Sequence, residues 1–374
     1  MSSDRAWASV DFGTLSLLFG LMIVSAAFHV AGFYHWVAVK VQGLDVSPRM
    51  LLAILIAISG LLSSLLTNDV VVVAMVPLLI EITVGRGLNP IPFLLGFCFA
   101  ANAGSAGSMI GSPQNMIIAG HLKVSFTQFF TAGLVPALLS LPVIWGVLVA
   151  LYRGRWSTRP VPVTAADIKP VAINKLEMIK AAIVLFAVIG FFLFSSVPYA
   201  IVALAAAGVL LLNRRAIGVK SSDLLGEVDG NLLLLVFSLY VINAAFSQTA
   251  YPQMALDFMA SHGLGVENPY AVLVIISILS DLADNNSAVM LLTPYADVGH
   301  PLVSTAALAL GAGFSSNIVN FGSLAGIIVV ESAARNGVKI SFMEFFRAGV
   351  IASVIALFLA AGWIALLQAM VVGA

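Results

Sequence analysis

The chain has 374 residues, of which 61% are hydrophobic and only 9% are charged, and its formal net charge is zero. A soluble domain carries roughly 25% charged residues because water must hydrate its surface, so this composition excludes an ordinary soluble globular protein. The mean hydropathy is +1.07, and the continuous Leu-, Ala- and Val-rich runs reach the ~20 residues that a helix needs to cross a bilayer. The sequence therefore predicts an all-α polytopic membrane protein, with the lipid bilayer as its surroundings and no nucleic-acid partner.

The cysteine and histidine content excludes several kinds of site. Cys98 is the only cysteine, which excludes a disulfide framework and a cysteine-based metal cluster within one chain. The five histidines are scattered and form no zinc signature. The sequence Ala-Gly-Ser-Ala-Gly at 103–107 is similar to a protease-type nucleophile motif, but no His or Lys base is placed beside it. We therefore expect a protein that is not an enzyme and that uses no organic cofactor.

Two of the apolar segments have polar centres. The segments lie at 12–36, 50–84, 92–120, 126–152, 176–195, 198–213, 230–250, 269–298, 302–333 and 343–371. The polar residues are Ser63, Ser64, Thr67, Asn68 and Asp69 within 50–84, and Ser280, Asp281, Asp284, Asn285, Asn286 and Ser287 within 269–298. Polar groups at this depth are tolerated only where they line protein or a water-filled cavity. We expect both segments to be re-entrant hairpins that turn near the bilayer midplane.

The distribution of basic residues tests this topology, because cytoplasmic loops carry an excess of Lys and Arg. If both hairpins return to the side they entered, one face carries only Arg5 and Lys123. The other face carries Lys40, Arg49, Arg86, Arg153, Arg155, Arg159, Lys169, Lys175, Lys180, Arg214, Arg215, Lys220, Arg335, Lys339 and Arg347. We therefore expect the first hairpin to enter from the cytoplasm and the second from outside.

The sequence also contains an internal repeat. Ser-Phe-Thr-Gln-Phe-Phe-Thr-Ala-Gly at 125–133 recurs as Ser-Phe-Met-Glu-Phe-Phe-Arg-Ala-Gly at 341–349, and the same alignment of the halves places Asn68 near Asn285. Because the two hairpins enter from opposite faces, the repeat is predicted to be inverted, as in alternating-access transporters. The predicted units are a first repeat at 1–152, a cytoplasmic linker at 153–175 and a second repeat at 176–374.

Two further segments, 92–120 and 302–333, are predicted to be broken helices. The first contains Gly111, Ser112 and Asn115, and the second contains Asn317, Asn320, Gly322 and Ser323. Glycine and proline unwind a helix, and the freed carbonyls and side-chain oxygens can hold a dehydrated cation. The positive ends of the half-helices can hold an anion.

The order of a hairpin with an Asn motif, a Gly-Ser-Pro-Gln-Asn break and the same pair again resembles the ion transporter superfamily. That group includes the divalent-anion/sodium symporters, the arsenite permeases, the citrate-metal transporters (CitMHS) and the sodium/proton antiporters of the NhaD type. The resemblance covers nearly the whole chain. It implies a chain that is short at its N-terminus by one or two membrane helices, with that terminus outside.

The resemblance also implies which segments form the site. The tips at 67–69 and 284–286 resemble the Ser-Asn-Thr hairpin tips of the dicarboxylate symporters, and the breaks at 111–115 and 315–323 resemble the loops that complete their sodium and substrate sites. The carboxylates Asp69, Asp281 and Asp284 depart from that pattern, because fixed negative charges repel a dicarboxylate in a low dielectric. The tips are closer to those of arsenite permeases and NhaD-type antiporters.

The sequence therefore predicts an ion-coupled (Na⁺ or H⁺) secondary active transporter of a small inorganic or organic anion or oxyanion, located in the cytoplasmic (inner) membrane. The alternatives are an NhaD-type Na⁺/H⁺ antiporter, in which Asp69 and Asp284 exchange the cations, and an arsenite-efflux-type permease. Na⁺ is expected at Asn68, Asp69, Asp284 and Asn285. The predicted binding residues are Ser64, Thr67, Asn68, Asp69, Gly111, Ser112, Asn115, Asp281, Asp284, Asn285, Asn286, Asn317, Asn320, Gly322 and Ser323.

The resemblance finally implies an elevator-type architecture. The hairpins and broken helices would form a mobile transport domain, and 12–36, 176–213 and 230–250 would contribute to the scaffold of a homodimer. The arms at 37–49 and 251–267 would be amphipathic helices at the membrane interface. Asn68 and Asn285 are expected to anchor two equivalent half-sites.

Overall fold

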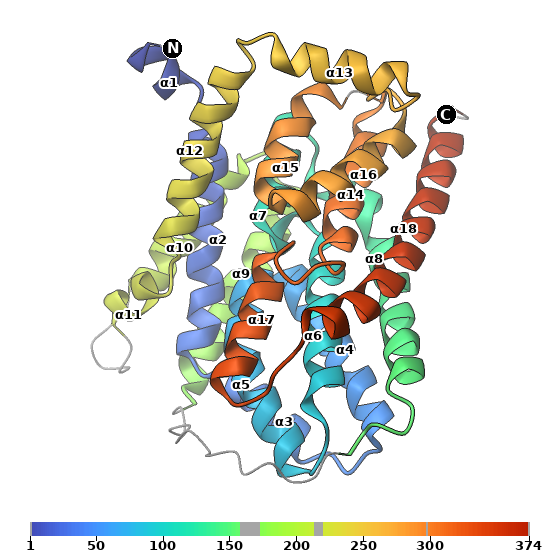
Figure 1. The fold of residues 1–374 in the computed structure, drawn as a ribbon. Helices are drawn as coiled ribbons and strands as arrows, with labels where there is room; N and C mark the ends of the chain where they lie inside the picture. The colour runs from blue at the N-terminus through green and yellow to red at the C-terminus, as the bar shows by residue number, and fades with distance from the viewer. Residues whose placement is uncertain (1, 158–172, 213–219, 297, 373–374) are drawn as a thin grey trace.

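The computed structural model describes residues 2–157, 173–212, 220–296 and 298–372 as a bundle of helices (Figure 1). No β-strand occurs within these residues, and an isolated bridge pairs Leu88 with Ser157. The elements of the first half are α1 (Ser3–Ala8), α2 (Phe12–Val30), α3 (Phe33–Gln42), α4 (Pro48–Leu65), α5 (Asn68–Gly85), α6 (Pro90–Ala106), the 3₁₀ turn η1 (Met109–Gly111), α7 (Pro113–Leu122) and α8 (Phe126–Leu151).

The second half follows a similar order after two additional helices. Its elements are α9 (Lys175–Phe194), α10 (Tyr199–Leu211), α11 (Ser221–Gly226), α12 (Gly230–Phe246), α13 (Tyr251–Ser261), α14 (Pro269–Leu282), α15 (Asn285–Leu292), the 3₁₀ turn η3 (Thr293–Tyr295), α16 (Pro301–Ser315), α17 (Leu324–Arg335) and α18 (Phe342–Val372). Of the described helices, six are long and apolar enough to cross a membrane, and the α12–α13 pair, bent by 79°, adds a seventh if it counts as one span.

The two interrupted segments form helical hairpins. The chain reverses between α4 and α5 and again between α14 and α15, and the helices of each hairpin contact one another. In Figure 1, α4 and α5 occupy the lower part of the molecule, whereas α14 and α15 occupy the upper part. Polar residues begin both return helices, because α5 starts at Asn68 and α15 starts at Asn285. The hairpins therefore approach the interior from opposite ends.

Both predicted broken helices are interrupted in the structure. α6 ends at Ala106 and α7 begins at Pro113, with η1 between them, while α16 ends at Ser315 and α17 begins at Leu324. Proline suits the first turn of α7 because the N–H that it lacks has no partner within the helix at that position. The interruptions leave backbone groups of both helices free of helical hydrogen bonds.

The repeated sequence motif has a packing role in each half. A Cβ atom on Gly133 would lie 2.6 Å from the carbonyl oxygen of Ala106, so only glycine lets α8 approach the end of α6 so closely. A Cβ atom on Gly349 would overlap the carbonyl oxygen of Asn317, where α18 passes the break after α16. The two copies of the motif therefore place a long helix against the two breaks in the same manner.

Several boundaries differ from the sequence-based expectation. The helix expected over 12–36 ends at Val30, and α3 already begins at Phe33, because the chain turns at Ala31 and Gly32. The arm expected at 251–267 is helical over Tyr251–Ser261. Most of the linker expected at 153–175 lies outside the described residues.

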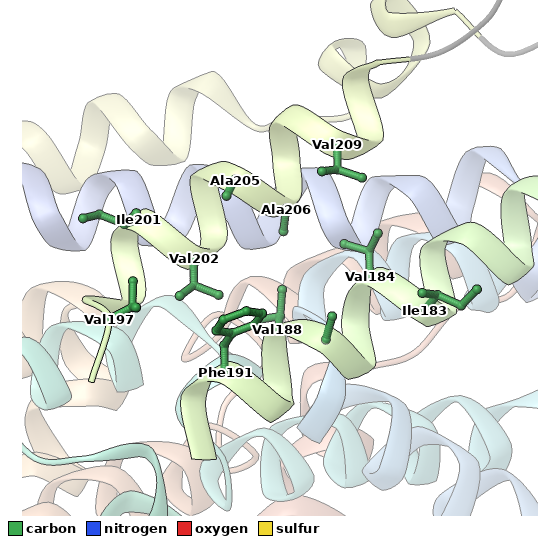
Figure 2. Close-up of a pocket in the computed structure, with 11 residues that line it drawn as sticks. Ile183, Val184, Val188, Phe191, Val197, Ile201, Val202, Ala205, Ala206 and Val209 are labelled. Atoms are coloured by element: carbon green, nitrogen blue, oxygen red, sulfur yellow. The ribbon is translucent and has the colours of Figure 1, made fainter. Parts of the chain in front are cut away.

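The surface formed by α9 and α10 is apolar. A groove of about 410 Å³ between these two helices is lined by aliphatic side chains and Phe191, as Figure 2 shows. On α12, the buried side chains are Leu232 and Val236, and the other residues of that helix are partly or fully exposed in the single chain. Such surfaces are expected where a protein contacts lipid or another subunit within the membrane.

Candidate functional site

The turn of the first hairpin is buried and contains oxygen atoms without donors. Asn68 Nδ2 donates a hydrogen bond to Asn102 Oδ1 at 3.4 Å, and the backbone N–H of Thr67 donates to Ser25 Oγ on α2 at 3.1 Å. Asn68 Oδ1, Thr67 Oγ1 and Ser63 Oγ are buried and have no hydrogen-bond partner among the described residues. A buried polar atom without a partner costs about 1–3 kcal/mol. These oxygens therefore indicate the place of a ligand.

The first break lies directly against this turn. A Cβ atom on Gly111 would lie 2.7 Å from the backbone oxygen of Ser63 and 2.6 Å from Cα of Ser105, so glycine is required at this contact. Asn115 Nδ2 donates to the backbone oxygens of Ser105 and Ser108, both at 2.8 Å. These two bonds fix the Asn115 amide and leave its Oδ1 atom buried without a donor.

Five buried, unpartnered oxygens belong to the first hairpin turn and to the adjoining first break, and together we call these residues the first half-site. They are Ser63 Oγ, Thr67 Oγ1, Asn68 Oδ1, Ser112 Oγ and Asn115 Oδ1. All five belong to neutral side chains, and hydroxyl and amide oxygens are hard ligands that suit a hard cation. No group of three or more His, Cys, Asp or Glu residues that could hold a metal ion occurs in the described part of the chain. The chemistry of the first half-site therefore suits an alkali cation.

Asn102 connects the two halves of the molecule. Its Oδ1 accepts the bond from Asn68, and its Nδ2 donates to Asn317 Oδ1 at 2.9 Å and to Ser323 Oγ at 3.0 Å. Asn317 Nδ2 donates in turn to the backbone oxygen of Phe99 at 3.3 Å. The first tip and the second break are therefore joined by one chain of side-chain hydrogen bonds.

The second hairpin turn satisfies its asparagine within the protein. Asn285 Oδ1 accepts from Ser280 Oγ at 2.6 Å, and Asn285 Nδ2 donates to Ser316 Oγ at 2.8 Å. Ser316 directly precedes Asn317 at the end of α16, and Asn317 is hydrogen-bonded to Asn102. The second tip therefore lies next to the chain of hydrogen bonds that contains Asn102. The two tips and the two breaks are thereby assembled in one buried site.

Side chains also cap the helices that start in the second half of this site. Asp284 Oδ2 accepts from the backbone N–H groups of Asn286 at 3.1 Å and Ser287 at 3.2 Å, which caps α15. Ser323 Oγ accepts from the N–H of Gly326 at 3.1 Å, which caps α17. We use the term second half-site for Asp284, Asn285, Asn286, Ser316 and Ser323.

Two other carboxylates lie at the hairpin turns. Asp69 is half-buried in the first turn of α5, has no hydrogen bond or ion pair in the described part of the chain, and is repelled by the charges of Asp284 and Asp229. Asp281 Oδ1 is buried without a partner, and a Cβ atom on Gly322 would lie 2.7 Å from it. The predicted carboxylates therefore lie at the edge of the site. Of these, the carboxylate of Asp284 caps a helix.

Some residues of the site were not among those predicted from the sequence, and two predicted residues contribute little to it. The hydroxyl of Ser64 donates to the backbone oxygen of Leu61 in its own helix, whereas the neighbouring Ser63 faces the site. Asn320 lies in the second break, and its side chain makes no hydrogen bond within the described residues. The missed residues are Ser63, Asn102, Ser105, Ser280 and Ser316.

A polar cavity of about 420 Å³ lies between α2, α7, α12 and α15. Asp11, Tyr240 and Asn243 line it together with His121 and Lys123 at the end of α7. Lys123 is one of the two basic residues that the charge distribution assigns to the outer face. The cavity therefore combines basic side chains with two helices, α7 and α15, that begin in the site.

Comparison with known proteins places this arrangement in a family. Residues 1–302 match the family model described as Citrate transporter (CitMHS). The chain belongs to the citrate transporter family. The matched region contains the whole first half-site and the second hairpin, and it ends just after α16 begins. The family assignment agrees with the resemblance to the ion transporter superfamily, and it makes the chain a multi-pass transporter of the cytoplasmic membrane.

Several membrane proteins and transporters are similar in sequence to this member of the citrate transporter family. An uncharacterized transporter of Mycobacterium tuberculosis is 30% identical over 376 residues, which cover 95% of this chain and 86% of that protein. A 46 kDa membrane protein of Mycobacterium leprae is 29% identical over 94% of this chain and 85% of its own length. The silicon efflux transporter LSI3 of Oryza sativa subsp. japonica is 35% identical over 140 residues, which are 37% of this chain and 29% of that protein.

The fold itself is similar to that of a solved transporter. The crystal structure of the YdaH transporter of Alcanivorax borkumensis superimposes with a TM-score of 0.59 and 15% sequence identity, covering 99% of this chain and 90% of that one. At this level of identity the likeness concerns the fold. It supports an all-helical transporter architecture for this member of the citrate transporter family.

Proposed function

We propose that this protein is a secondary active transporter that couples the movement of a small anion or oxyanion to Na⁺. The observation that carries the proposal is the first half-site, where five neutral oxygens are buried without donors beside the interruption between α6 and α7. Na⁺ would be held by these oxygens. Two helices with N-termini at this point, α5 and α7, have no side-chain cap, so their positive ends are available to an anion.

The absence of buried basic residues supports ion coupling. None of the Lys and Arg side chains in the described part of the chain is buried, and the site contains the carboxylates of Asp69, Asp281 and Asp284. An anion placed there without a compensating cation would be repelled in a medium of low dielectric constant. Co-binding of Na⁺ would offset that repulsion, which is the physical basis of coupled movement.

The polar cavity near the outer ends of α7 and α15 supports an anionic substrate. Lys123 lines it together with His121 and the carboxylate of Asp11, and the ammonium group of Lys123 at the mouth of the site would attract anions. A citrate-like or other small anion would be concentrated there before it reaches the helix N-termini of the site.

A second candidate is transport driven by protons, as in Na⁺/H⁺ exchange or the efflux of a weak oxyacid. Asp69 favours it, because this carboxylate is half-buried, has no partner among the described residues and is repelled by Asp284 and Asp229. A similar protein is named a silicon efflux transporter. In this scheme Asp69 would accept and release the coupling proton.

Uptake by purified protein in proteoliposomes distinguishes these functions. Citrate, succinate, sulfate, arsenite and sodium are supplied in turn under an inward Na⁺ gradient, under an inward H⁺ gradient, and without either. We expect saturable uptake of at least one of the anions that requires the Na⁺ gradient. Anion uptake that follows only the H⁺ gradient, or Na⁺ flux driven by protons without an anion, would replace the proposal with the second candidate.

We further propose that the two halves are inverted repeats and that the site moves as in an elevator, on a homodimeric scaffold of α2, α9, α10 and α12. The equivalent contacts of Gly133 and Gly349 and the opposite directions of the hairpins support the repeat. The exposed apolar surfaces of α9, α10 and α12 support a dimer. Two hydrogen bonds, from the Thr67 N–H to Ser25 and from Asn243 to the Met290 backbone oxygen, cross the proposed boundary and would break when the site moves.

A further inference from the structure

The two copies of the repeated motif differ in chemistry at two positions. In the first copy, Gln128 completes a capping box: its Oε1 accepts from the Ser125 N–H at 2.8 Å, and its own N–H donates to Ser125 Oγ at 3.2 Å. In the second copy, Ser341 Oγ still accepts from the N–H of Glu344 at 3.1 Å. The Glu344 carboxylate, however, turns away and accepts from the hydroxyl of Tyr152 at 2.8 Å.

This difference creates a pocket where α8 ends and α18 begins. Its volume is about 250 Å³, and its polar walls are Tyr152, Arg155, Ser341, Glu344 and Arg347. Arg347 occupies the position that Thr131 has in the first copy of the motif. Substitution of Gln by Glu and of Thr by Arg therefore replaces a neutral helix start with one that carries both signs of charge.

The arginines of this pocket remain available for a ligand. The guanidinium of Arg155 lies over the ring of Tyr152, 4.8 Å from its centroid, and its Nη2 donates to the backbone oxygen of Leu151 at 2.6 Å. Within the described residues, neither Arg155 nor Arg347 forms an ion pair with Asp or Glu. One oxygen of Glu344 is engaged by Tyr152, and the other is not. The pocket thus offers two guanidinium groups and one carboxylate oxygen.

We propose that this pocket binds the phosphoethanolamine headgroup of a phospholipid in the cytoplasmic leaflet. The phosphate would lie between Arg155 and Arg347, because guanidinium groups bind phosphate oxygens through paired hydrogen bonds. The ammonium group would lie at Glu344, which would repel a purely anionic headgroup. A zwitterion satisfies both signs of charge at once, whereas a lipid with only a phosphate leaves the carboxylate without a partner.

The position of the pocket favours a lipid over a soluble compound. The charge distribution assigns Arg155 and Arg347 to the cytoplasmic face, where basic pockets between membrane helices bind headgroups. About 20 Å further along α8 and α18, these helices present exposed apolar side chains, including Leu138, Leu139 and Phe358, along which acyl chains can lie. The inference is independent of which substrate the protein carries.

Lipid binding to the purified full-length protein tests the proposal. Thermal stability and bound-lipid mass are measured in detergent with phosphatidylethanolamine, phosphatidylglycerol and phosphatidylcholine of identical acyl chains, and with soluble phosphoethanolamine. We expect the largest stabilisation and tightest binding with phosphatidylethanolamine. Equal binding of phosphatidylethanolamine and phosphatidylglycerol would overturn the proposal, and stabilisation by soluble phosphoethanolamine equal to that by the lipid would assign the pocket to a soluble ligand instead.

Variants distinguish the two charges. Glu344→Gln keeps an acceptor for Tyr152 and should abolish the preference for phosphatidylethanolamine over phosphatidylglycerol. Arg347→Gln should weaken the binding of both lipids by about tenfold, the effect of losing one charge-assisted hydrogen bond. Arg335→Gln, an exposed arginine paired with Glu331, is the matched control and should bind like the wild type. Unchanged lipid preference in Glu344→Gln would contradict the assignment of the ammonium group.

Discussion

The two half-sites contain similar residues but differ in how their polar groups are satisfied. In the second, Asn285 is hydrogen-bonded at both ends of its amide, Asp284 caps α15 and Ser323 caps α17. In the first, α5 and α7 have no side-chain cap, and five oxygens have no donor among the described residues. In the second half-site, one buried side-chain atom, Asn286 Oδ1, has no partner among the described residues, and the side chains of its other residues are hydrogen-bonded without a ligand. In the first half-site, the five buried oxygens would gain a partner only when a cation binds to them.

This difference distinguishes the two hairpin tips, which look equivalent in the sequence repeat. An asparagine at the tip of each hairpin suggests two equivalent anchors. In the structure, the Asn285 amide is hydrogen-bonded through both its oxygen and its nitrogen, whereas the Asn68 amide donates one bond to Asn102 and its oxygen has no partner among the described residues. We infer that the coupling ion binds in the first half-site, and that the second half-site positions the helices around it.

The largest expected effect distinguishes the two asparagines. Asn68→Ala removes a proposed Na⁺ ligand, so the Na⁺ concentration for half-maximal uptake should rise about 10- to 100-fold, the cost of one hydrogen-bond-strength contact to a charge. Asn285→Ala leaves Ser280 without its partner and leaves Ser316 with only the backbone oxygen of Ala312, so the free energy of unfolding should fall by about 1–3 kcal/mol. Na⁺-dependent uptake and thermal unfolding are measured on both variants. The opposite pattern, with Asn285→Ala changing Na⁺ affinity and Asn68→Ala only stability, would reverse the assignment.

The next effect concerns Asp69. Asp69→Asn removes one negative charge from the group formed with Asp284 and Asp229, while the unfolding free energy changes by less than about 1 kcal/mol, the usual value of a charge in the first turn of a helix. If Na⁺ is the coupling ion, uptake should still require a Na⁺ gradient, and its pH profile should become flatter. Uptake measured from pH 5.5 to about pH 8.5 checks this. Complete loss of transport with an intact fold would favour Asp69 as a proton carrier.

A smaller effect is expected at Asp284. Its carboxylate caps α15, so Asp284→Ala should lower stability by about 1 kcal/mol, whereas Asp284→Asn keeps a capping oxygen and should cost only a few tenths. Thermal unfolding of the two variants gives the ranking. Equal destabilisation by Ala and Asn would show that the charge, not the cap, matters here.

The smallest effect lies outside the site. Glu227 Oε2 and His29 Nδ1 are 2.7 Å apart, and this hydrogen bond holds the pKa of Glu227 below its usual value. The stabilisation is therefore present at neutral pH and is lost as the pH falls through the pKa of Glu227 in the folded protein. Because both groups are partly exposed, Glu227→Gln should lower the unfolding free energy by only about 0.2–1 kcal/mol at pH 7. A difference from wild type that persists below pH 4 would contradict this.

Much of the fold could be predicted from the sequence because the bilayer imposes strong constraints. Polar residues in the middle of the apolar segments at 50–84 and 269–298 indicated both hairpins, and the Gly, Pro and Asn clusters indicated both breaks. The site was harder to predict. Ser63 and Ser64 are neighbours of the same type, and only the rotation of α4 decides which of the two hydroxyls is buried without a partner.

For Asn102, the sequence contained an indication that was not used in predicting the binding residues. It is a lone amide in the apolar sequence Phe-Cys-Phe-Ala-Ala-Asn-Ala-Gly, and an amide buried there needs partners. Its partners, Asn68, Asn317 and Ser323, are remote in sequence, so spacing alone could not assign it to the site. The hydrogen bonds that distinguish Asn68 from Asn285 also come from contacts remote in sequence, so the difference could not be deduced from the repeat.

Direct Na⁺ binding to a Ser63→Ala variant tests the central claim most simply. Ser63 Oγ is fully buried and has no partner among the described residues, so removal of this oxygen changes the fold little unless it binds a ligand. Ser140→Ala is the matched control, since Ser140 is equally buried but donates to the Ala137 backbone oxygen of its own helix. Binding is measured by titrating purified protein with NaCl at constant ionic strength and following heat release or the shift in thermal midpoint. The account predicts Na⁺ affinity about tenfold weaker in Ser63→Ala and unchanged in Ser140→Ala, whereas equal affinities in wild type and Ser63→Ala would contradict it.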